Sequence, residues 1–346
     1  MESQFWNDNK IFIIAEIGSN HNGDLELCKK MFIKAKECGA DAVKLQKRYN
    51  DKTFTKAILN APYQSEYAQK TGTYREHREY LDRFDKKEFT ELKKLADDIG
   101  IIFFATPFDF ESVDFLASLD MPLYKVASCD FRNIPLIEYI AKLGKPMLLS
   151  TGGADYKTMD FVYDKLVKIN IDFAFLYCVS KYPNSDADLD LNCISVMRKL
   201  FPMSIGFSSH HPGLWPLSSA YHAGARIFEM HFTFNRAWAN INKDHAFSLE
   251  PQALRKACYD LKRIPTMMGS GERIVSEEEK MGFVHKFGKS LHLDRPVKKG
   301  EILTIDKVSI KAPADGIEPH RLDEIIGKIF ICDLSTSDFL TEDKLQ

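Results

Sequence analysis

Glu229 and His231 lie two residues apart within an otherwise apolar run, "ARIFEMHFTFN" at residues 225–235. If this run is a β-strand, successive side chains point to opposite faces. Glu229, His231 and Thr233 then share one face, while the intervening phenylalanine and methionine side chains occupy the other. An acid and an imidazole on one face can bind a metal ion or transfer protons. The chemistry therefore depends on which other residues the fold brings to that face.

Eight short apolar runs alternate with longer stretches of helical periodicity along the chain. The runs occupy residues 11–18, 40–46, 100–108, 123–128, 145–152, 173–180, 203–211 and 225–233. This alternation indicates repeated β-α units and a parallel sheet, and eight such units over about 250 residues are typical of a (β/α)₈ TIM barrel. A doubly wound open sheet is the alternative, but the G-x-G-x-x-G motif that would favour it does not follow the first run.

Polar side chains gather at the carboxyl ends of these runs, where a TIM barrel places its active site. Taken singly, such a lysine can be merely solvated, a serine can cap the next helix and a histidine can belong to the core. Together they predict an anion site of lysines and hydroxyls beside a metal site of two histidines, with two carboxylates nearby. The residues are Glu16, Lys44, Gln46, Thr106, Lys125, Ser128, Ser150, Thr151, Ser180, Tyr182, Ser208, His210, Glu229 and His231.

Charge and cysteine content argue against several other classes of function. Lysine and arginine number 47 against 49 aspartate and glutamate residues, so no overall field favours nucleic acid or an anionic membrane as a partner. The first ten residues carry no signal pattern and no apolar run nears the roughly 20 residues of a membrane span, which predicts a cytoplasmic protein. The seven cysteines include no C-x-x-C pair, which favours reduced thiols over disulfides or a zinc cluster.

Two segments lie outside the repeated units. Residues 47–85 exceed a normal loop and are rich in tyrosine and charge, so they could fold over the barrel mouth or be a passive insertion. After the barrel, Ser276 and Glu279 form a capping-box pattern for a helix, and the tail beyond it reads as short strands with tight turns. We therefore expect a barrel domain at 1–280 and a small domain at 287–346, which docks on the barrel or on a partner subunit because it is marginal alone.

Several motifs in this order resemble the sialic acid synthase family across nearly the whole chain. They are "AEIGSNHNGD", "AVKLQ", "FFATPFD", "YKVASCDFRNIPLI", "GKPMLLSTGG", "YCVSKYP", "GFSSHHPG" and "FEMHFT", and the tail is similar to the family's antifreeze-like (SAF) domain. The resemblance implies an enzyme that condenses phosphoenolpyruvate with a six-carbon amino sugar to give phosphate and a nine-carbon 2-keto acid, a sialic acid-like nonulosonate. It also implies a homodimer with a domain-swapped tail that closes the partner subunit's site.

Position by position, the resemblance implies roles for the strand-end residues. A divalent metal, Mn²⁺ in first place with Mg²⁺ or Co²⁺ as alternatives, would bind His210 and His231. The sugar would contact Glu16, Gln46 and Asp244, while Glu16, Glu229 and Asp244 would be the catalytic acids, bases or water holders. Phosphoenolpyruvate would be held by Lys44, Thr106, Lys125, Ser128, Ser150 and Ser208, with Ser180 and Tyr182 completing the substrate site.

Two departures from the family pattern concern the sugar more than the reaction. Ser180 stands in "VSKYP" where the best-known members carry asparagine, and Ala312 stands in "IKAPADG" where they carry an arginine that reaches the partner's sugar pocket. Loss of that cation predicts that N-acetylmannosamine is a poor substrate and that the natural aldose is differently substituted. Two other functions are consistent with the residues: a metal-dependent aldolase or isomerase, and an inactive carbohydrate-binding barrel.

Overall fold

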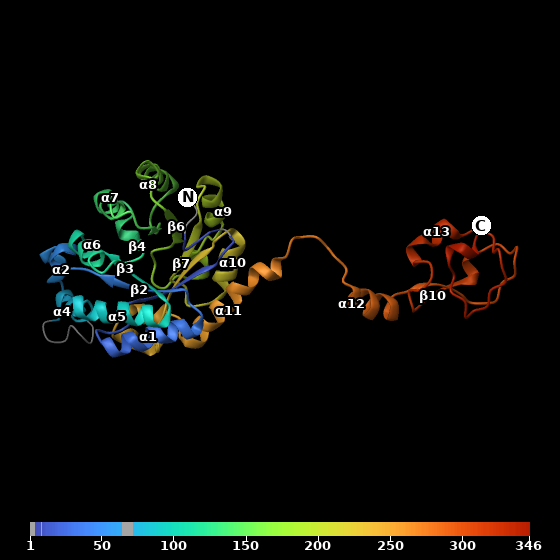
Figure 1. The fold of residues 1–346 in the computed structure, drawn as a ribbon, viewed down its shortest axis with the longest axis horizontal. Coiled ribbons are helices and arrows are strands. Elements are labelled where there is room, and N and C mark those ends of the chain that lie inside the picture. The colour runs from blue at the N-terminus through green and yellow to red at the C-terminus, as the bar shows by residue number, and fades with distance from the viewer. Residues whose placement is uncertain (1–3, 8, 64–71) are drawn as a thin grey trace. The chain divides into compact units, whose positions relative to one another are not determined.

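A computed structural model describes residues 4–7, 9–63 and 72–346 of the chain. The chain forms two compact units, Met1–Met268 and Gly269–Gln346, and each is described by itself (Figure 1). The first unit ends with the last barrel helix, and the second contains the short strands predicted for the tail.

Among the described residues of the first unit, eight parallel strands close into a barrel in the order β1 to β8. The strands are β1 Phe12–Gly18, β2 Ala42–Lys47, β3 Ile102–Pro107, β4 Tyr124–Val126, β5 Met147–Ser150, β6 Phe173–Cys178, β7 Ile205–Ser209 and β8 Ile227–His231. Each overlaps a predicted run, which confirms the TIM barrel and excludes the open sheet.

Helices connect the strands and surround the barrel (Figure 1). The longer ones are α1 Leu25–Cys38, α5 Lys86–Ile99, α6 Phe110–Ala117, α7 Ile134–Ala141, α8 Tyr156–Ile169, α9 Asn192–Leu200, α10 Trp215–Ala223 and α11 Pro251–Met268, and the β2–α5 connection adds α2 Asn50–Thr53, α3 Lys56–Leu59 and α4 Tyr74–Leu81. Short 3₁₀ turns occupy η2 Ser128–Asp130, η3 Asp186–Asp188, η4 Arg236–Asn240 and η5 Lys243–Phe247. In the described part of the chain, no helix combines the length and the apolar character that crossing a membrane requires.

Aspartates begin several of the helices that follow the strands. The carboxylates of Asp24, Asp109 and Asp155 accept a backbone N–H of the first helical turn at 3.0, 2.7 and 2.9 Å. Such a cap satisfies a donor that the helix itself leaves unpaired. Each helix therefore starts at a defined residue after its strand, which fixes the length of the loop that borders the barrel mouth.

The side chains inside the barrel change from apolar to polar along the strand direction. The apolar layer near the strand starts comprises Phe12, Ile14, Ala42, Phe104, Leu148, Ala174, Leu176 and Ile227, with Trp6 packed among them. Residues two or four positions further along the same strands, such as Glu16, Lys44 and Glu229, are buried but polar. Because alternate residues of a strand share a face, they point into the same interior. Gly206 makes room for the apolar layer, since a Cβ there would lie 2.3 Å from Leu176 Cδ2.

The opposite face of the strands packs against the helices. Phe228 and Met230 belong to the large core between sheet and helices, whereas Glu229 and His231 lie on the barrel's interior side. The strand register then places Glu16 beside Lys44 on β2 and beside His231 on β8. The predicted alternation is therefore confirmed over β8, residues 227–231, where it brings the polar residues of three neighbouring strands together. Thr233 follows the strand and is not among the described residues that line the cavity at the barrel mouth.

The second unit is small but has its own apolar core. Its elements are α12 Glu277–Glu279, a π-helical turn at Lys280–His285, β9 Ser290–Leu293, η7 Ile305–Lys307, β10 Val308–Lys311, η8 Pro319–Arg321, α13 Leu322–Ile325 and η9 Glu342–Lys344. Strands β9 and β10 pair antiparallel. The core includes Leu291, Leu303, Phe330 and Leu340, all fully buried. Ser276 caps the first helix as predicted, accepting the backbone N–H of Glu279 at 3.1 Å, but the α-helix lasts three residues before it widens into the π-turn.

Candidate active site

A cavity of about 560 Å³ lies at the carboxyl ends of the barrel strands, within the roughly 300–1,000 Å³ range of small-molecule sites. All fourteen residues predicted as catalytic, substrate-binding or metal-binding line it. They are Glu16, Lys44, Gln46, Thr106, Lys125, Ser128, Ser150, Ser180, Tyr182, Ser208, His210, Glu229, His231 and Asp244. Thr151 is not among the described lining residues, because its buried hydroxyl donates to the Leu176 carbonyl oxygen at 3.2 Å.

Two carboxylates and a lysine form a buried cluster within this cavity. Lys44 Nζ lies 2.8 Å from Glu16 Oε2 and 3.7 Å from Glu229 Oε2, and it donates to Thr106 Oγ1 at 3.0 Å. None of the three ionisable side chains is more than 6% exposed, so water screens their charges little. One ammonium cannot balance two carboxylates, and the protonation of the pair therefore depends on further neighbours.

The two carboxylates differ in pKa although both are buried. Burial raises the pKa of Glu16 to about 7, and the charge of Lys44 opposes this shift only in part. Burial acts on Glu229 in the same direction, but the positive charges of Lys125 and Lys44 outweigh it and lower the pKa of Glu229 to about 2. At neutral pH Glu16 can therefore give up or accept a proton while Glu229 stays ionised. Acid–base catalysis uses such a difference in pKa between two neighbouring carboxyl groups.

Ser208 fixes one oxygen of Glu229 and leaves the other available. Ser208 Oγ donates to Glu229 Oε1 at 3.0 Å. Glu229 Oε2 is buried and has no hydrogen-bond partner among the described residues. Because a buried carboxylate oxygen normally accepts a hydrogen bond, Oε2 can accept one from a substrate hydroxyl or from water.

Lys125, Ser128 and Ser150 form a second polar group around the ends of β4 and β5. Lys125 Nζ lies 2.6 Å from Ser150 Oγ and 2.9 Å from the Val126 carbonyl oxygen. Ser128 Oγ accepts the backbone N–H of Gly152 at 3.1 Å. A Cβ at Gly152 would lie 2.2 Å from Ser180 Oγ and 2.6 Å from Ser128 Oγ, so only glycine fits where these hydroxyls converge. The group presents an ammonium and several hydroxyls to an anion.

His210 and His231 lie side by side at the cavity wall, with ring centroids 5.4 Å apart. His210 Nδ1 is 3.0 Å from the Val179 carbonyl oxygen, an arrangement that places the proton on Nδ1 and leaves Nε2 free to bind a cation. His231 Nδ1 is buried without a hydrogen-bond partner among the described residues, and burial lowers the pKa of this imidazole. Phe247 packs against both rings at 5.5 and 4.9 Å.

These two histidines suit a metal that keeps open positions. Among the described residues, no group of three or more histidine, cysteine or acidic side chains is placed to hold a metal ion. A neutral imidazole pair with free ring nitrogens is nevertheless an acceptable donor set for Mn²⁺, Co²⁺ or Mg²⁺ when water or substrate oxygens complete the coordination. The residues therefore fit a divalent metal that binds together with the substrate.

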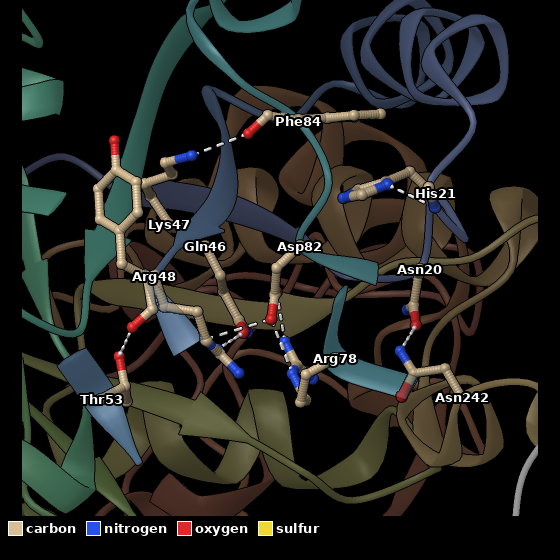
Figure 2. Close-up of polar contacts among 12 residues, drawn as sticks. Asn20, His21, Gln46, Lys47, Arg48, Thr53, Arg78, Asp82, Phe84 and Asn242 are labelled. Carbon is tan, nitrogen blue, oxygen red and sulfur yellow. Dashed lines mark hydrogen bonds and ion pairs between the residues drawn. The ribbon is translucent and has the colours of Figure 1, made fainter. Parts of the chain in front are cut away.

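Asp244 comes from η5, on the connection between β8 and α11, and a hydrogen-bond network fixes that connection. Its backbone N–H donates to Asn242 Oδ1 at 3.3 Å, and its carbonyl oxygen accepts Ser248 Oγ at 2.6 Å. Asn242 Nδ2 in turn donates to Asn20 Oδ1 at 3.1 Å, a contact drawn in Figure 2. Asn20 also donates to Ser248 Oγ at 2.9 Å. The loop after β1 therefore holds Asp244 at the cavity.

Three arginines that were not predicted as site residues line the same cavity: Arg48, Arg78 and Arg132. Arg48 and Arg78 belong to the 47–85 segment, so the described part of this segment contributes to the cavity wall, and residues 64–71 lie outside the described residues. Figure 2 shows both side chains beside Asp82. Arg48 follows Gln46 by two positions, a spacing that could have indicated a shared direction. No local pattern marks Arg78, because only the fold of α4 brings it to the barrel.

Comparison with known proteins agrees with the fold and the residues of the cavity. Residues 31–273 match the NeuB family and residues 288–346 match the SAF domain. The chain belongs to the NeuB family. The second match covers most of the compact unit at 269–346.

Similar curated and solved proteins cover most of the chain. N-acetylneuraminate-9-phosphate synthase of Homo sapiens is 36% identical over 334 residues, covering 96% of this chain and 92% of the relative. N,N′-diacetyllegionaminic acid synthase of Campylobacter jejuni is 34% identical over 323 residues, covering 92% and 96%. The crystal structure of N-acetylneuraminic acid synthetase from Leptospira borgpetersenii, in complex with citrate, matches with a TM-score of 0.67 at 33% identity, covering 80% of this chain and 90% of that one.

Proposed function

We propose that this NeuB-family protein condenses phosphoenolpyruvate with an open-chain aldose and water, giving a 2-keto-3-deoxy sugar acid and inorganic phosphate. The observation that carries the proposal is the convergence of two lysines, several hydroxyls, two histidines and two carboxylates of different pKa in one cavity. A simple metal-dependent aldolase would use the histidines but would have no use for the lysine and hydroxyl groups. The names of the relatives, which are sialic and legionaminic acid synthases, support the same reaction.

Phosphoenolpyruvate is assigned to the group around Lys125. Its phosphate and carboxylate need compact cations and oriented hydroxyls, which Lys125, Ser128 and Ser150 present together. Thr106 and Ser208 extend this surface towards Lys44 and Glu229. Ser180 and Tyr182 complete it from the loop after β6, where Tyr182 packs on His210 with ring centroids 4.2 Å apart.

Carbon–carbon bond formation needs an electrophilic aldehyde close to the phosphoenolpyruvate methylene carbon. His210 and His231 would hold the divalent metal, for which we favour Mn²⁺, and a bound metal would polarise the aldehyde oxygen. Attack by the methylene carbon forms the new bond and leaves positive charge at C2 of the former phosphoenolpyruvate. The aldehyde oxygen takes up a proton, and Glu16 supplies it because its raised pKa keeps a proton available near pH 7.

The second half of the reaction adds water at C2. Ionised Glu229 stabilises the positive carbon, and its free Oε2 accepts a hydrogen bond from the incoming water. The water gives up a proton to Glu16, which lost its own in the first step, and the result is a tetrahedral carbon that bears both hydroxyl and phosphate. Its collapse breaks the C–O bond to phosphate, the hydroxyl proton leaves with the phosphate, and the 2-keto group forms. Asp244 and Gln46 position the sugar hydroxyls from opposite sides of β1.

Sugar-dependent phosphate release tests the proposal directly. With phosphoenolpyruvate, Mn²⁺ and a panel of aldoses that includes N-acylated amino sugars, we expect one phosphate per keto acid formed, and none when sugar is omitted. Lys125→Met is the matched negative variant, which should lose this phosphate release. The substitution removes the ammonium beside Ser150 without adding bulk. If no aldose in a wide panel releases phosphate and calorimetry detects no phosphoenolpyruvate binding, the proposed function is wrong.

We also propose that the protein acts as a homodimer in which the second unit closes the partner subunit's site. The first part of the second unit supports this, because Ile274, Met281, Phe283 and Phe287 are all more than half exposed. Large apolar side chains gathered on one short segment favour a protein partner over water.

Light scattering is therefore expected to give a dimer at working concentration. Removal of residues 287–346 should sharply lower the activity, because the partner subunit's site would then stay open to water, while the thermal transition of the barrel persists. A monomer in solution, or a truncated protein with full activity, would exclude this assembly.

The names of the relatives differ in whether the product carries a phosphate. The human relative is named for a 9-phosphate product and the Campylobacter relative for an unphosphorylated one. Because three of the nine carbons come from phosphoenolpyruvate, a 9-phosphate corresponds to a phosphate on the last carbon of a six-carbon sugar.

A further inference from the structure

Arg48 and Arg78 form a buried cationic pair at the side of the cavity. Arg48 follows β2 and Arg78 lies on α4, and the two residues are only 8% and 7% exposed. Both line the cavity, and Figure 2 shows their side chains converging on Asp82. The reaction proposed above uses neither of them.

A single carboxylate, that of Asp82, serves both guanidinium groups. Arg78 is bidentate to it, with Nε 2.8 Å from Oδ2 and Nη2 bonded to Oδ1. Arg48 Nε lies 3.9 Å from the same Oδ2, which is too far for a hydrogen bond, and it has no hydrogen-bond partner among the described residues. Asp244 is near enough for its charge to act on Arg78, but no ion pair within 4.0 Å joins them among the described contacts. The pair therefore carries an uncompensated positive charge.

The Arg48 guanidinium is held in a fixed orientation. It stacks on the Phe108 ring at 4.0 Å, and its Nη2 donates to Gln46 Oε1. Burial of a cation costs free energy unless an anion compensates it. A rigid arginine that keeps free donors on a cavity wall is the arrangement that binds planar or tetrahedral oxyanions.

The position of the pair connects it to the sugar rather than to phosphoenolpyruvate. Arg48 bonds Gln46, and Gln46 Nε2 donates to Glu16 Oε1 at 3.0 Å, so the arginines continue the set of residues assigned to the sugar. The group around Lys125 and Ser150 belongs to β4 and β5, two and three strands further round the barrel from β2. An anion at Arg48 would thus belong to the second substrate.

We propose that Arg48 and Arg78 form a second anion site that binds a phosphomonoester on the aldose, so that this enzyme condenses phosphoenolpyruvate with a sugar phosphate. The proposal rests on the proposed function. A carboxylate would need only one bidentate arginine, as Asp82 shows on Arg78. A phosphomonoester carries about −1.5 to −2 charges at pH 7 and three acceptor oxygens, which matches two guanidinium groups that share one carboxylate.

The test compares matched sugars on matched variants. The sugars are N-acetylmannosamine, N-acetylglucosamine and mannose, each with and without a 6-phosphate, measured by calorimetry and by phosphate release. Arg48→Gln removes the net positive charge but keeps the Arg78–Asp82 pair intact, whereas replacing Arg78 would leave the buried Asp82 without its hydrogen-bonded arginine. Arg48→Lys keeps the charge without the planar fork. Arg75→Gln is the control, because Arg75 lies on α4 like Arg78 but pairs with Asp51 outside the cavity.

We expect the wild type to bind and convert the phosphorylated member of at least one sugar pair at least about tenfold better, the effect of one charge-assisted contact. The ratio of phosphorylated to unphosphorylated sugar turnover should fall to near one in Arg48→Gln. It should be intermediate in Arg48→Lys and unchanged in Arg75→Gln. A wild type without the preference overturns the proposal. A preference that persists in Arg48→Gln while the KM for phosphoenolpyruvate rises also overturns it, because the arginines would then serve the first substrate.

Two further outcomes separate this inference from the proposed function. Turnover of unphosphorylated sugars alone refutes the anion site and leaves the condensation standing. Preferential binding of sugar phosphates without any turnover supports the anion site and refutes the condensation. If the Arg48 variants do not fold, the wild type alone is tested. A preference for the phosphorylated sugar that weakens with added salt and with inorganic phosphate supports an ionic site. A preference that neither salt nor inorganic phosphate changes overturns the proposal.

Discussion

Glu229→Gln is expected to lower kcat by about 10²–10⁴-fold, the range for loss of a positioned acid, base or charge-stabilising group. The substitution keeps the shape of the side chain and can keep the hydrogen bond from Ser208. It removes the negative charge that Lys44 and Lys125 maintain. The positive charge that develops at C2 would then face a neutral amide, and water would meet a weaker acceptor.

The measurement is single-turnover phosphate release with saturating substrates, beside thermal unfolding of both proteins. Binding of phosphoenolpyruvate should not weaken, because the variant leaves Lys44 and Lys125 less compensated. Glu250→Gln is a suitable control. Glu250 accepts the backbone N–H of Arg236 at 3.0 Å, and it is not among the described residues that line the cavity. A Glu229→Gln enzyme with kcat near that of the wild type would remove Glu229 from the mechanism.

The barrel and the members of its site could be predicted because both depend on local periodicity. Alternation along "IFEMHF" places Glu229 and His231 on one face whatever the surroundings, and eight strand ends of a closed barrel must meet at one mouth. The same reasoning placed Thr151 in the site and was wrong there. Thr151 immediately follows Ser150, so it turns to the other side and bonds the neighbouring strand.

The arginines and the protonation states could not be predicted from local pattern. Arg78 reaches the cavity only because the β2–α5 connection folds back so that Arg78 and Arg48 meet at Asp82, and no local pattern in the sequence predicts that packing. The difference between the Glu16 and Glu229 pKa values comes from distances to Lys44 and Lys125, which reside on two other strands. The effect of Ala312 stays a prediction, since it concerns a contact between the second unit and a partner subunit.

Metal binding gives the other large expected effect. His231→Ala should weaken Mn²⁺ binding by more than the 10–100-fold that loss of an outer-shell partner causes, because it removes one of only two protein ligands proposed for the ion. Turnover should fall with it, since the aldehyde would lose its polarising cation. Electron paramagnetic resonance of bound Mn²⁺, titrated into the metal-free protein, measures the affinity independently of activity.

His211→Ala is the matched control for that titration. His211 is adjacent to His210 in the chain, but both of its ring nitrogens are already used: Nδ1 accepts the backbone N–H of Gly213 at 2.9 Å and Nε2 lies 3.0 Å from Asp186. It therefore has no free nitrogen for a cation, whereas the Nδ1 of His231 is buried without a partner among the described residues. Equal loss of Mn²⁺ in both variants would indicate a general disturbance of the loop after β7. Unchanged binding in His231→Ala would place the metal elsewhere and leave the orientation of His231 to be explained by substrate contact alone.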